Sequence, residues 1–65
     1  MPHIHISLVE GRDPEKIRNL ITAVTDAVVT AGDAPPETVT VVVTEFPATH
    51  WARGDRTIAE KRAGG

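Results

Sequence analysis

The sequence predicts a small α/β (α+β) domain built on a strand–helix–strand unit and completed by a short C-terminal hairpin. Two stretches, HIHISLV and VTVVVTEF, are rich in apolar residues that recur with the period of a β-strand. The segment between them repeats its apolar residues at the spacing of an α-helix. Because strands joined through a long helix pair in parallel with a right-handed crossover, we expect a parallel βαβ subunit.

The first strand and the helix have clear boundaries in the sequence. HIHISLV alternates apolar and polar residues, and Gly11 ends the strand. Asp13 has the features of a helix N-cap, because Pro14 follows it at the first helical position. The apolar stripe that begins there predicts one helix over residues 14–31, with Gly32 as the residue that ends it.

The remainder of the chain predicts a second strand and a hairpin. VTVVVTEF is rich in β-branched residues, and Pro47 closes it. Further on, Gly54 and Asp55 predict a turn between two short strands. No repeat or linker divides the chain, so residues 1–65 are expected to form a single domain, with residues 61–65 as a flexible tail.

Composition and charge exclude several classes of protein. The formal net charge of −2 offers no basic surface, so neither a nucleic acid nor a membrane is expected as a partner. No apolar run approaches the ~20 residues of a membrane span, and no basic and apolar leader precedes the first strand, which predicts a cytoplasmic protein. The sequence has no cysteine, which excludes disulfides, iron–sulfur clusters and thiolate zinc sites.

The second strand predicts that the chain assembles with copies of itself. A chain of 65 residues builds only a marginal core of its own. Both faces of the second strand are free of charge through residues 39–44, yet one helix covers only one face of a two-stranded sheet. The other face and the open sheet edges are therefore expected to contact other copies in a homo-oligomer.

Pro2 is the first candidate for chemistry. If Met1 is removed, the chain begins with a secondary amine, whose reference pKa near 7.7–8.0 is already close to working pH. An apolar wall and a nearby cation would lower that pKa and leave more of the amine neutral, as a general base requires. The alternative is that Met-Pro is simply a frequent start with no chemical role.

Two further side chains are candidates for a binding site beside such a base. Arg12 ends the EGR motif just before the helix, where a guanidinium can hold a carboxylate through two hydrogen bonds. Trp51 follows the second strand and can form the apolar wall of a pocket. The alternatives are a solvated loop arginine and a tryptophan that anchors an oligomer interface.

The histidines offer a weaker hypothesis. His3 and His5 are two residues apart on one strand face, and His50 is the only remaining histidine. A zinc site needs three protein ligands and their supporting hydrogen bonds. Strand histidines that face an interface explain the pattern equally well, so no metal site is assigned.

Taken in order, these motifs resemble the 4-oxalocrotonate tautomerase (2-hydroxymuconate tautomerase) family. The likeness rests on the proline after Met1, a short strand, EGR, an amphipathic helix, APPETV, a valine-rich strand ending in TE, and HW, over residues 2–54 without gaps. The resemblance implies a homohexamer of tautomerase-like βαβ subunits whose active sites combine residues from neighbouring subunits. It also implies an enzyme that uses no cofactor.

The resemblance assigns roles to five positions. Pro2 matches the catalytic base, and Arg12 matches an arginine that holds a substrate carboxylate. Trp51 takes the place of an aromatic residue, usually phenylalanine, that makes the pocket apolar and helps to lower the pKa of the proline. Val9 and Thr38 match positions whose backbone or side chain contacts the substrate or ordered water.

The chain departs from the family at one functional position. Thr40 stands where the family commonly has a second arginine that polarises the substrate oxygen. A neutral hydroxyl is a poor substitute, because charge-assisted hydrogen bonds are about twice as strong as neutral ones. Arg53 or Arg56 in the predicted hairpin is expected to supply the missing charge from another direction.

The function implied by the resemblance is interconversion of the enol and keto forms of a small 2-hydroxy-dienoate or 2-oxo acid. Two alternatives remain open. Relatives in the wider superfamily use the same amino-terminal proline as dehalogenases or decarboxylases. Thr40 favours a non-catalytic oligomeric binding module, whereas Pro2, Arg12 and Trp51 favour an enzyme.

Overall fold

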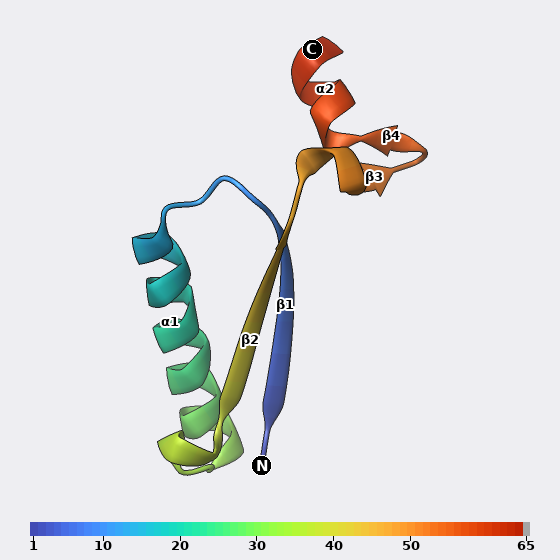
Figure 1. The fold of residues 1–65 in the computed structure, drawn as a ribbon. Coiled ribbons are helices and arrows are strands. Elements are labelled where there is room, and N and C mark those ends of the chain that lie inside the picture. Colours follow the sequence, from blue (N-terminus) through green and yellow to red (C-terminus); the bar gives the residue numbers. More distant parts are fainter. Residues whose placement is uncertain (65) are drawn as a thin grey trace.

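A computed structural model describes residues 1–64 of the chain. Figure 1 shows a long strand pair with one helix alongside, and a smaller unit beyond the far end of the strands. The elements are, in order, β1 (His3–Val9), α1 (Pro14–Gly32), the 3-10 turn η1 (Pro36–Thr38), β2 (Thr40–Phe46), the 3-10 turn η2 (Ala48–His50), β3 (Ala52–Arg53), β4 (Arg56–Thr57) and α2 (Ile58–Gly64).

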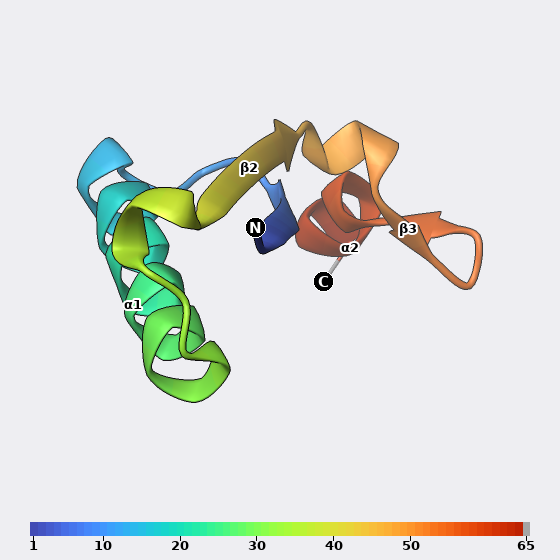
Figure 2. The ribbon, with the colours of Figure 1, turned by 90° about the horizontal axis from the view of Figure 1, so that it is seen from below.

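The predicted parallel βαβ unit is confirmed. β1 and β2 pair in parallel over their whole length, with His3 opposite Thr40 and Val9 opposite Phe46. α1 makes the crossover between them and packs against β2, as two views of the ribbon show (Figures 1 and 2). Within the described residues this sheet has only two strands, so each strand keeps one unpaired edge.

The helix begins as predicted and ends one residue later. Asp13 is extended at the N-cap, and its carbonyl accepts a 2.9 Å hydrogen bond from the Lys16 N–H, although its side chain makes no capping bond. The prediction that Gly32 ends the helix is wrong, because Asp33 takes the left-handed conformation with φ 52°. Aspartate tolerates that conformation better than most residues. Neither helix of residues 1–64 has the length and apolarity that crossing a membrane requires.

One copy of the chain has no interior. None of residues 1–64 is buried, and the chain extends over 45 × 24 × 15 Å. Its radius of gyration is 15.1 Å, whereas a compact domain of this length would have about 11 Å. The accessible surface of 4806 Å² likewise exceeds the about 4,000 Å² typical of a folded monomer of this mass.

The two faces of the β1–β2 sheet differ in burial. Ile4 and Ile6 are half-buried, as expected of residues under α1, whereas His3 and His5, which alternate with them, are exposed. β2 exposes Val42 to 40% on the face that the histidines share. This second face is the one that the alternating valines predict to be covered by another copy.

The predicted hairpin is confirmed. β3 and β4 pair antiparallel, with Ala52 opposite Thr57. Gly54 and Asp55 both have positive φ, 57° and 69°, as a two-residue type I′ turn requires. The Ile58 N–H donates a 2.8 Å hydrogen bond to the Trp51 carbonyl, which joins the hairpin to the helix that follows.

The short helix α2 is absent from the sequence-based prediction. Its start is fixed by a reciprocal pair of hydrogen bonds: the Thr57 N–H donates to Glu60 Oε1 at 2.8 Å, and the Glu60 N–H donates to Thr57 Oγ1 at 3.0 Å. This is a capping box, whose pattern T-x-x-E can be read in the sequence. The expected tail over residues 61–65 is helical through Gly64, Gly65 lies outside the described residues, and its flexibility stays a prediction.

Candidate active site

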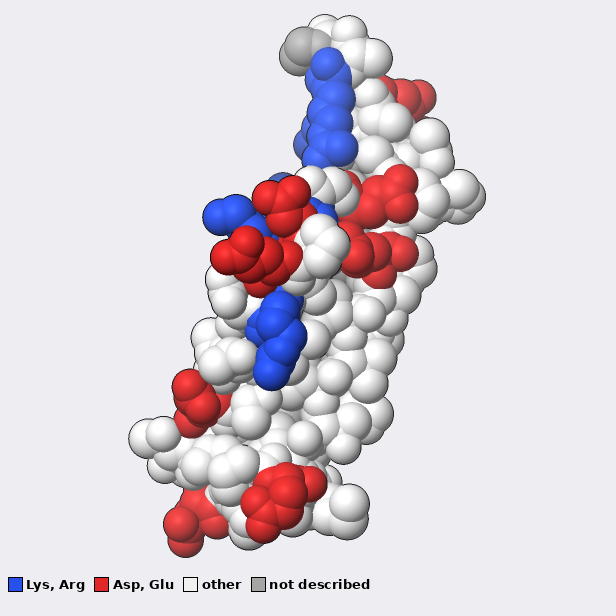
Figure 3. All heavy atoms as spheres, turned by 60° about the vertical axis from the view of Figure 1, so that its left-hand side comes forward, with Lys and Arg blue, Asp and Glu red and all other residues white. Residues whose placement is uncertain are grey.

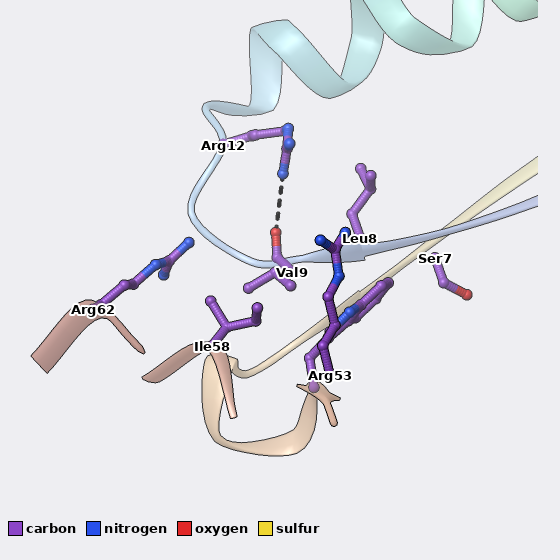
Figure 4. Close-up of a pocket in the computed structure, with 8 residues that line it drawn as sticks. Ser7, Leu8, Val9, Arg12, Arg53, Ile58 and Arg62 are labelled. Carbon is purple, nitrogen blue, oxygen red and sulfur yellow. Dashed lines mark hydrogen bonds between the residues drawn. The ribbon is translucent and has the colours of Figure 1, made fainter. Parts of the chain in front are cut away.

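A hollow of about 290 Å³ lies where the end of β1, the loop after it and the hairpin–α2 unit meet (Figure 4). Its walls come from both ends of the chain. The lining residues are Ser7, Leu8, Val9, Arg12, Trp51, Arg53, Ile58 and Arg62. Of the predicted site residues, the structure therefore brings together Val9, Arg12, Trp51 and Arg53.

The loop after β1 places Arg12 over the hollow. Gly11 has φ 129°, which an L side chain rarely adopts, although no atom lies within 4 Å of where a Cβ would stand. The turn at this glycine brings the Arg12 guanidinium back to the strand it follows, where its Nη1 donates a 3.1 Å hydrogen bond to the Val9 carbonyl. Only one N–H is used in this bond, so the remaining donors can bind an anion.

Trp51 lies in the wall of the hollow. Its ring packs edge to face on Phe46 at the end of β2, with ring centroids 6.3 Å apart and an interplanar angle of 63°. Such aromatic pairs hold each other in a defined orientation. The half-buried Ile58 and Leu8 complete the apolar part of the hollow.

The hollow is strongly cationic. Three of its lining residues are arginines, and among the described residues none that line it is acidic. Elsewhere the signs are mixed: acidic and basic side chains are interspersed over the face presented in Figure 3. Three guanidinium groups in one hollow of a chain whose net charge is −2 favour an anionic ligand.

Pro2 lies at the opposite end of the same strand. The hollow touches the last residues of β1, whereas Pro2 precedes the first, and its carbonyl accepts a 3.0 Å hydrogen bond from the Thr40 N–H. Seven strand residues separate the two ends, which is about 23 Å of chain. Within one copy, the expectation that Trp51 stands beside Pro2 and Arg12 is therefore not met.

Thr38 and Thr40 also lie at the Pro2 end. The Thr38 hydroxyl donates a 2.7 Å hydrogen bond to the Pro35 carbonyl, and Thr40 opens β2 opposite His3. The predicted site residues thus form two groups at the two ends of the sheet.

The histidines do not gather. His5 Nε2 lies 2.9 Å from Thr44 Oγ1 on the open sheet face, whereas His50 Nδ1 lies 2.9 Å from Thr49 Oγ1 in η2. In the part of the chain that the structure describes, no three side chains of the metal-binding types lie together.

Comparison with known proteins decides the family. The sequence model described as "Tautomerase enzyme" matches residues 2–61, which is nearly the whole chain. The chain belongs to the tautomerase family. It is 45% identical over 51 residues to a protein of Ralstonia nicotianae named Probable tautomerase, covering 78% of this chain and 73% of that one. It is also 36% identical over 62 residues to the 2-hydroxymuconate tautomerase of Pseudomonas sp. strain CF600, covering 95% and 98%.

Solved structures give the same result for this tautomerase. A 4-oxalocrotonate tautomerase isozyme of Methylibium petroleiphilum superposes with a TM-score of 0.96 at 34% identity, over 98% of this chain and 100% of that one. A 4-oxalocrotonate tautomerase homologue of the tomaymycin biosynthetic pathway gives 0.93 at 40% identity, over 95% of each chain. The resemblance drawn from the sequence and the predicted fold are thereby confirmed, and the chain is an enzyme of the isomerase class.

The structure separates the two hairpin arginines of the tautomerase. Arg53 lines the hollow, whereas Arg56 extends toward Gly64 at the end of α2. Of the two residues expected to supply the charge that Thr40 lacks, only Arg53 is therefore placed at the hollow.

Sequence reasoning missed four residues of the hollow. Ser7 and Leu8 lie on a predicted strand and line the hollow. Nothing in their residue types distinguishes them from other strand residues, so they could be recognised only once the position of the hollow was known. Ile58 and Arg62 come from α2, which the sequence analysis did not predict. The capping box in TIAE could have indicated this helix, and residues four apart on a helix lie on one face.

Proposed function

We propose that this tautomerase interconverts the enol and keto forms of a small 2-hydroxy-dienoate or 2-oxo acid, with Pro2 as the general base. The observation that carries the proposal is the hollow itself, in which three arginines surround an apolar floor with no acidic residue among the described side chains. Such a site can hold the anionic group of a small organic acid at the arginines and its carbon chain against the apolar side chains.

The proposed reaction needs one basic group and no redox step. The neutral Pro2 nitrogen takes the proton of the enol hydroxyl, and the electron pair moves through the conjugated chain as the carbonyl forms. The protonated amine then returns the proton to a carbon atom, so that atoms and charge balance. This chemistry requires that Met1 be removed, because a Pro2 nitrogen in a peptide bond has no basicity.

The side chains of the hollow have complementary tasks in this proposal. Arg12 holds the substrate carboxylate with the donors that Val9 leaves free. Trp51 excludes water from the reacting carbon chain. Arg53 polarises the substrate oxygen on which negative charge develops, the task for which Thr40 is unsuited.

The active site in this proposal is shared between copies. Pro2 and the hollow lie at opposite ends of β1, so the base of one subunit would serve the hollow of another. A homohexamer is the assembly we propose, supported by the lack of any buried residue in 1–64 and by the exposed second sheet face. One related 4-oxalocrotonate tautomerase, from Chloroflexus aurantiacus, is described as a heterohexamer, and the chain covers 97% of it at 35% identity.

A reversible block of the amino terminus tests the proposal. An N-terminal extension that keeps the Pro2 nitrogen in a peptide bond should abolish turnover of 2-hydroxymuconate, and proteolytic release of Pro2 should restore it. The restored kcat/KM should rise with pH as the amine loses its proton, through a value below the reference of about 7.7–8.0. Full activity of the extended protein, verified by intact mass, would refute Pro2 as the base.

A non-catalytic oligomeric binding module is the second candidate, and Thr40 is the observation that favours it. Such a module would bind organic acids in the hollow yet show no turnover after release of Pro2. The same experiment separates the two functions, provided that ligand binding is measured alongside activity.

A further inference from the structure

Phe46 is the last residue of β2, and its side chain does not itself line the hollow. This large apolar side chain is 37% exposed. We infer that Phe46 is a positioning residue, which orients the Trp51 ring in the wall of the hollow and so keeps water from the carbon chain of the ligand. The inference rests on the proposed function for the identity of that ligand and of the base.

The rings of Phe46 and Trp51 meet at a defined angle. Their centroids are 6.3 Å apart and their planes form an angle of 63°, so the contact is edge to face. The positive edge of one ring meets the negative face of the other, and this attraction depends on orientation as well as on distance. An aliphatic side chain in place of Phe46 could fill the same space, but it would not select one angle of the indole.

The chain between the two rings is short and hydrogen-bonded. Pro47 follows Phe46 directly, and the His50 N–H donates a 2.9 Å hydrogen bond to the Pro47 carbonyl across η2. The Trp51 carbonyl accepts a 2.8 Å hydrogen bond from the Ile58 N–H. These bonds hold the backbone on both sides of the indole, whereas Phe46 is the only other aromatic residue of the chain that can orient its ring.

Phe46 also connects this wall to the strand end that orients Arg12. It lies opposite Val9 in the strand register, and its carbonyl accepts a 2.8 Å hydrogen bond from the Glu10 N–H. The Val9 carbonyl in turn accepts the hydrogen bond from Arg12 Nη1. Phe46 therefore sets the indole at a fixed place relative to a carboxylate that Arg12 holds.

A purely structural role for Phe46 gives a different expectation. If the side chain only covers apolar surface, at the end of the strand or between copies, leucine should replace it without any effect on Trp51. Tyrosine retains the ring, and its hydroxyl can reach solvent because this position is partly exposed. Val42 is 40% exposed on the same strand and does not line the hollow, so Val42→Ala is the control for loss of apolar surface.

The first measurement needs no turnover. Trp51 is the only tryptophan of the chain, so the long-wavelength indole band in near-ultraviolet circular dichroism and the quenching of fluorescence by acrylamide report on this ring alone. In the assembled protein with Pro2 free, Phe46→Leu should weaken the band and increase the quenching, each by about twofold, because an edge-to-face contact favours the packed orientation by about twofold to tenfold. Phe46→Tyr and Val42→Ala should both retain the parent signals.

The second measurement follows turnover of 2-hydroxymuconate. Phe46→Leu should lower kcat about fivefold and leave KM within about twofold, because Arg12 still holds the carboxylate. The pH midpoint of kcat/KM should move up toward the reference value of about 7.7–8.0, since water beside a tilted ring stabilises the protonated amine. In a Trp51→Leu background, Phe46→Leu should change kcat by less than about twofold, because the ring that it positions is absent.

An unchanged indole band in Phe46→Leu would overturn the inference, as would an equal loss of the band in Phe46→Tyr or Val42→Ala. A full additional loss of kcat in the Trp51→Leu background would also overturn it, since Phe46 would then act by another route. Sedimentation checks that each variant assembles as the parent chain does. If Phe46→Leu does not, Phe46→Met repeats the comparison with an unbranched apolar side chain and should change both signals in the same direction.

The inference and the proposed function can fail separately. A weaker indole band in Phe46→Leu, in a protein that does not tautomerise enol acids after release of Pro2, supports the inference and refutes the function. Turnover of enol acids by the parent chain, with an indole band that Phe46→Leu leaves unchanged, supports the function and refutes the inference.

Discussion

The two ends of the β1–β2 sheet carry different chemistry. At one end, Pro2 and Thr40 are joined by a backbone hydrogen bond, and neither brings a charged side chain. At the other end, three arginines surround a hollow with apolar walls. A base and the cations that hold its substrate must act at one place, so under the proposed function each end is half of an active site.

The separation of the two ends also explains why a single copy has no core. The hairpin–α2 unit lies beyond the end of the β1–β2 strand pair (Figure 1). α1 runs along the strands and does not cover this unit. None of residues 1–64 is buried in this arrangement. Assembly would therefore complete both the core and the site, which couples stability to activity.

Mixing two impaired variants gives the largest expected effect. One variant has Pro2 blocked by an extension, and the other has Arg12→Ala, so neither has both halves of a site. If the halves come from different copies, unfolding and refolding a 1:1 mixture should restore about one quarter of the sites, because each site draws its two halves at random. The measurement is kcat/KM for 2-hydroxymuconate, because Arg12→Ala is expected to act mainly through KM.

The control is the same mixture without the unfolding step, which keeps the copies apart. A mixture that stays as inactive as its components after refolding would show that the halves do not combine.

The carboxylate-holding role of Arg12 predicts the next largest effect. Arg12→Ala should lower kcat/KM mainly through KM, by about 2–4 kcal/mol at most, as for truncation of one partner of a charge pair. Because Arg12 is exposed, solvent screening places the expected value at the lower end of that range.

Arg18→Ala is the matched control for Arg12. Arg18 Nη1 is hydrogen-bonded to Thr22 Oγ1 on α1, away from the hollow. An unchanged kcat/KM in Arg12→Ala, or an equal loss in Arg18→Ala, would return Arg12 to the status of a solvated loop residue.

The proposal that Arg53 replaces the arginine missing at position 40 predicts a smaller effect. If Arg53 performs the task of the missing strand arginine, Arg53→Ala should reduce kcat about tenfold, while Thr40→Arg should change it little in the parent chain. Arg56→Ala is the control, because Arg56 lies outside the hollow. If Thr40→Arg raises kcat while Arg53→Ala leaves it unchanged, Arg53 does not polarise the substrate oxygen. The site then lacks the positive charge that the family's strand arginine supplies.

The sequence predicts the βαβ unit well because its signals are local. The alternation in β1, the valines of β2 and the stripe of α1 each follow one period over many residues. The turn at Gly54 and Asp55 is equally local, since a type I′ turn demands positive φ at both positions. Resemblance then adds the roles that are expected of the candidate site residues.

The shape of the site could not be predicted in the same way. Pro2 precedes the predicted strand HIHISLV and Arg12 follows it, so the sequence places them at opposite ends of a strand, whereas the resemblance assigns both to a single site. How the copies meet to bring the two ends together cannot be read from the pattern of one chain. Arg62 was missed because α2 has only seven residues, too few for a visible apolar period. Its capping box was the available signal.

Weakening the capping box of α2 should have the smallest effect. The change should destabilise α2, beside the hollow, and leave the rest of the sheet unaffected. Glu60→Ala removes the acceptor of the Thr57 N–H, which should destabilise α2 by about 1 kcal/mol, whereas Glu60→Gln retains an acceptor and should behave as the parent chain. Amide hydrogen exchange should accelerate about fivefold in residues 58–64 of Glu60→Ala and remain unchanged in β1. Acceleration of exchange across β1 as well would show that the two ends of the sheet are not independent.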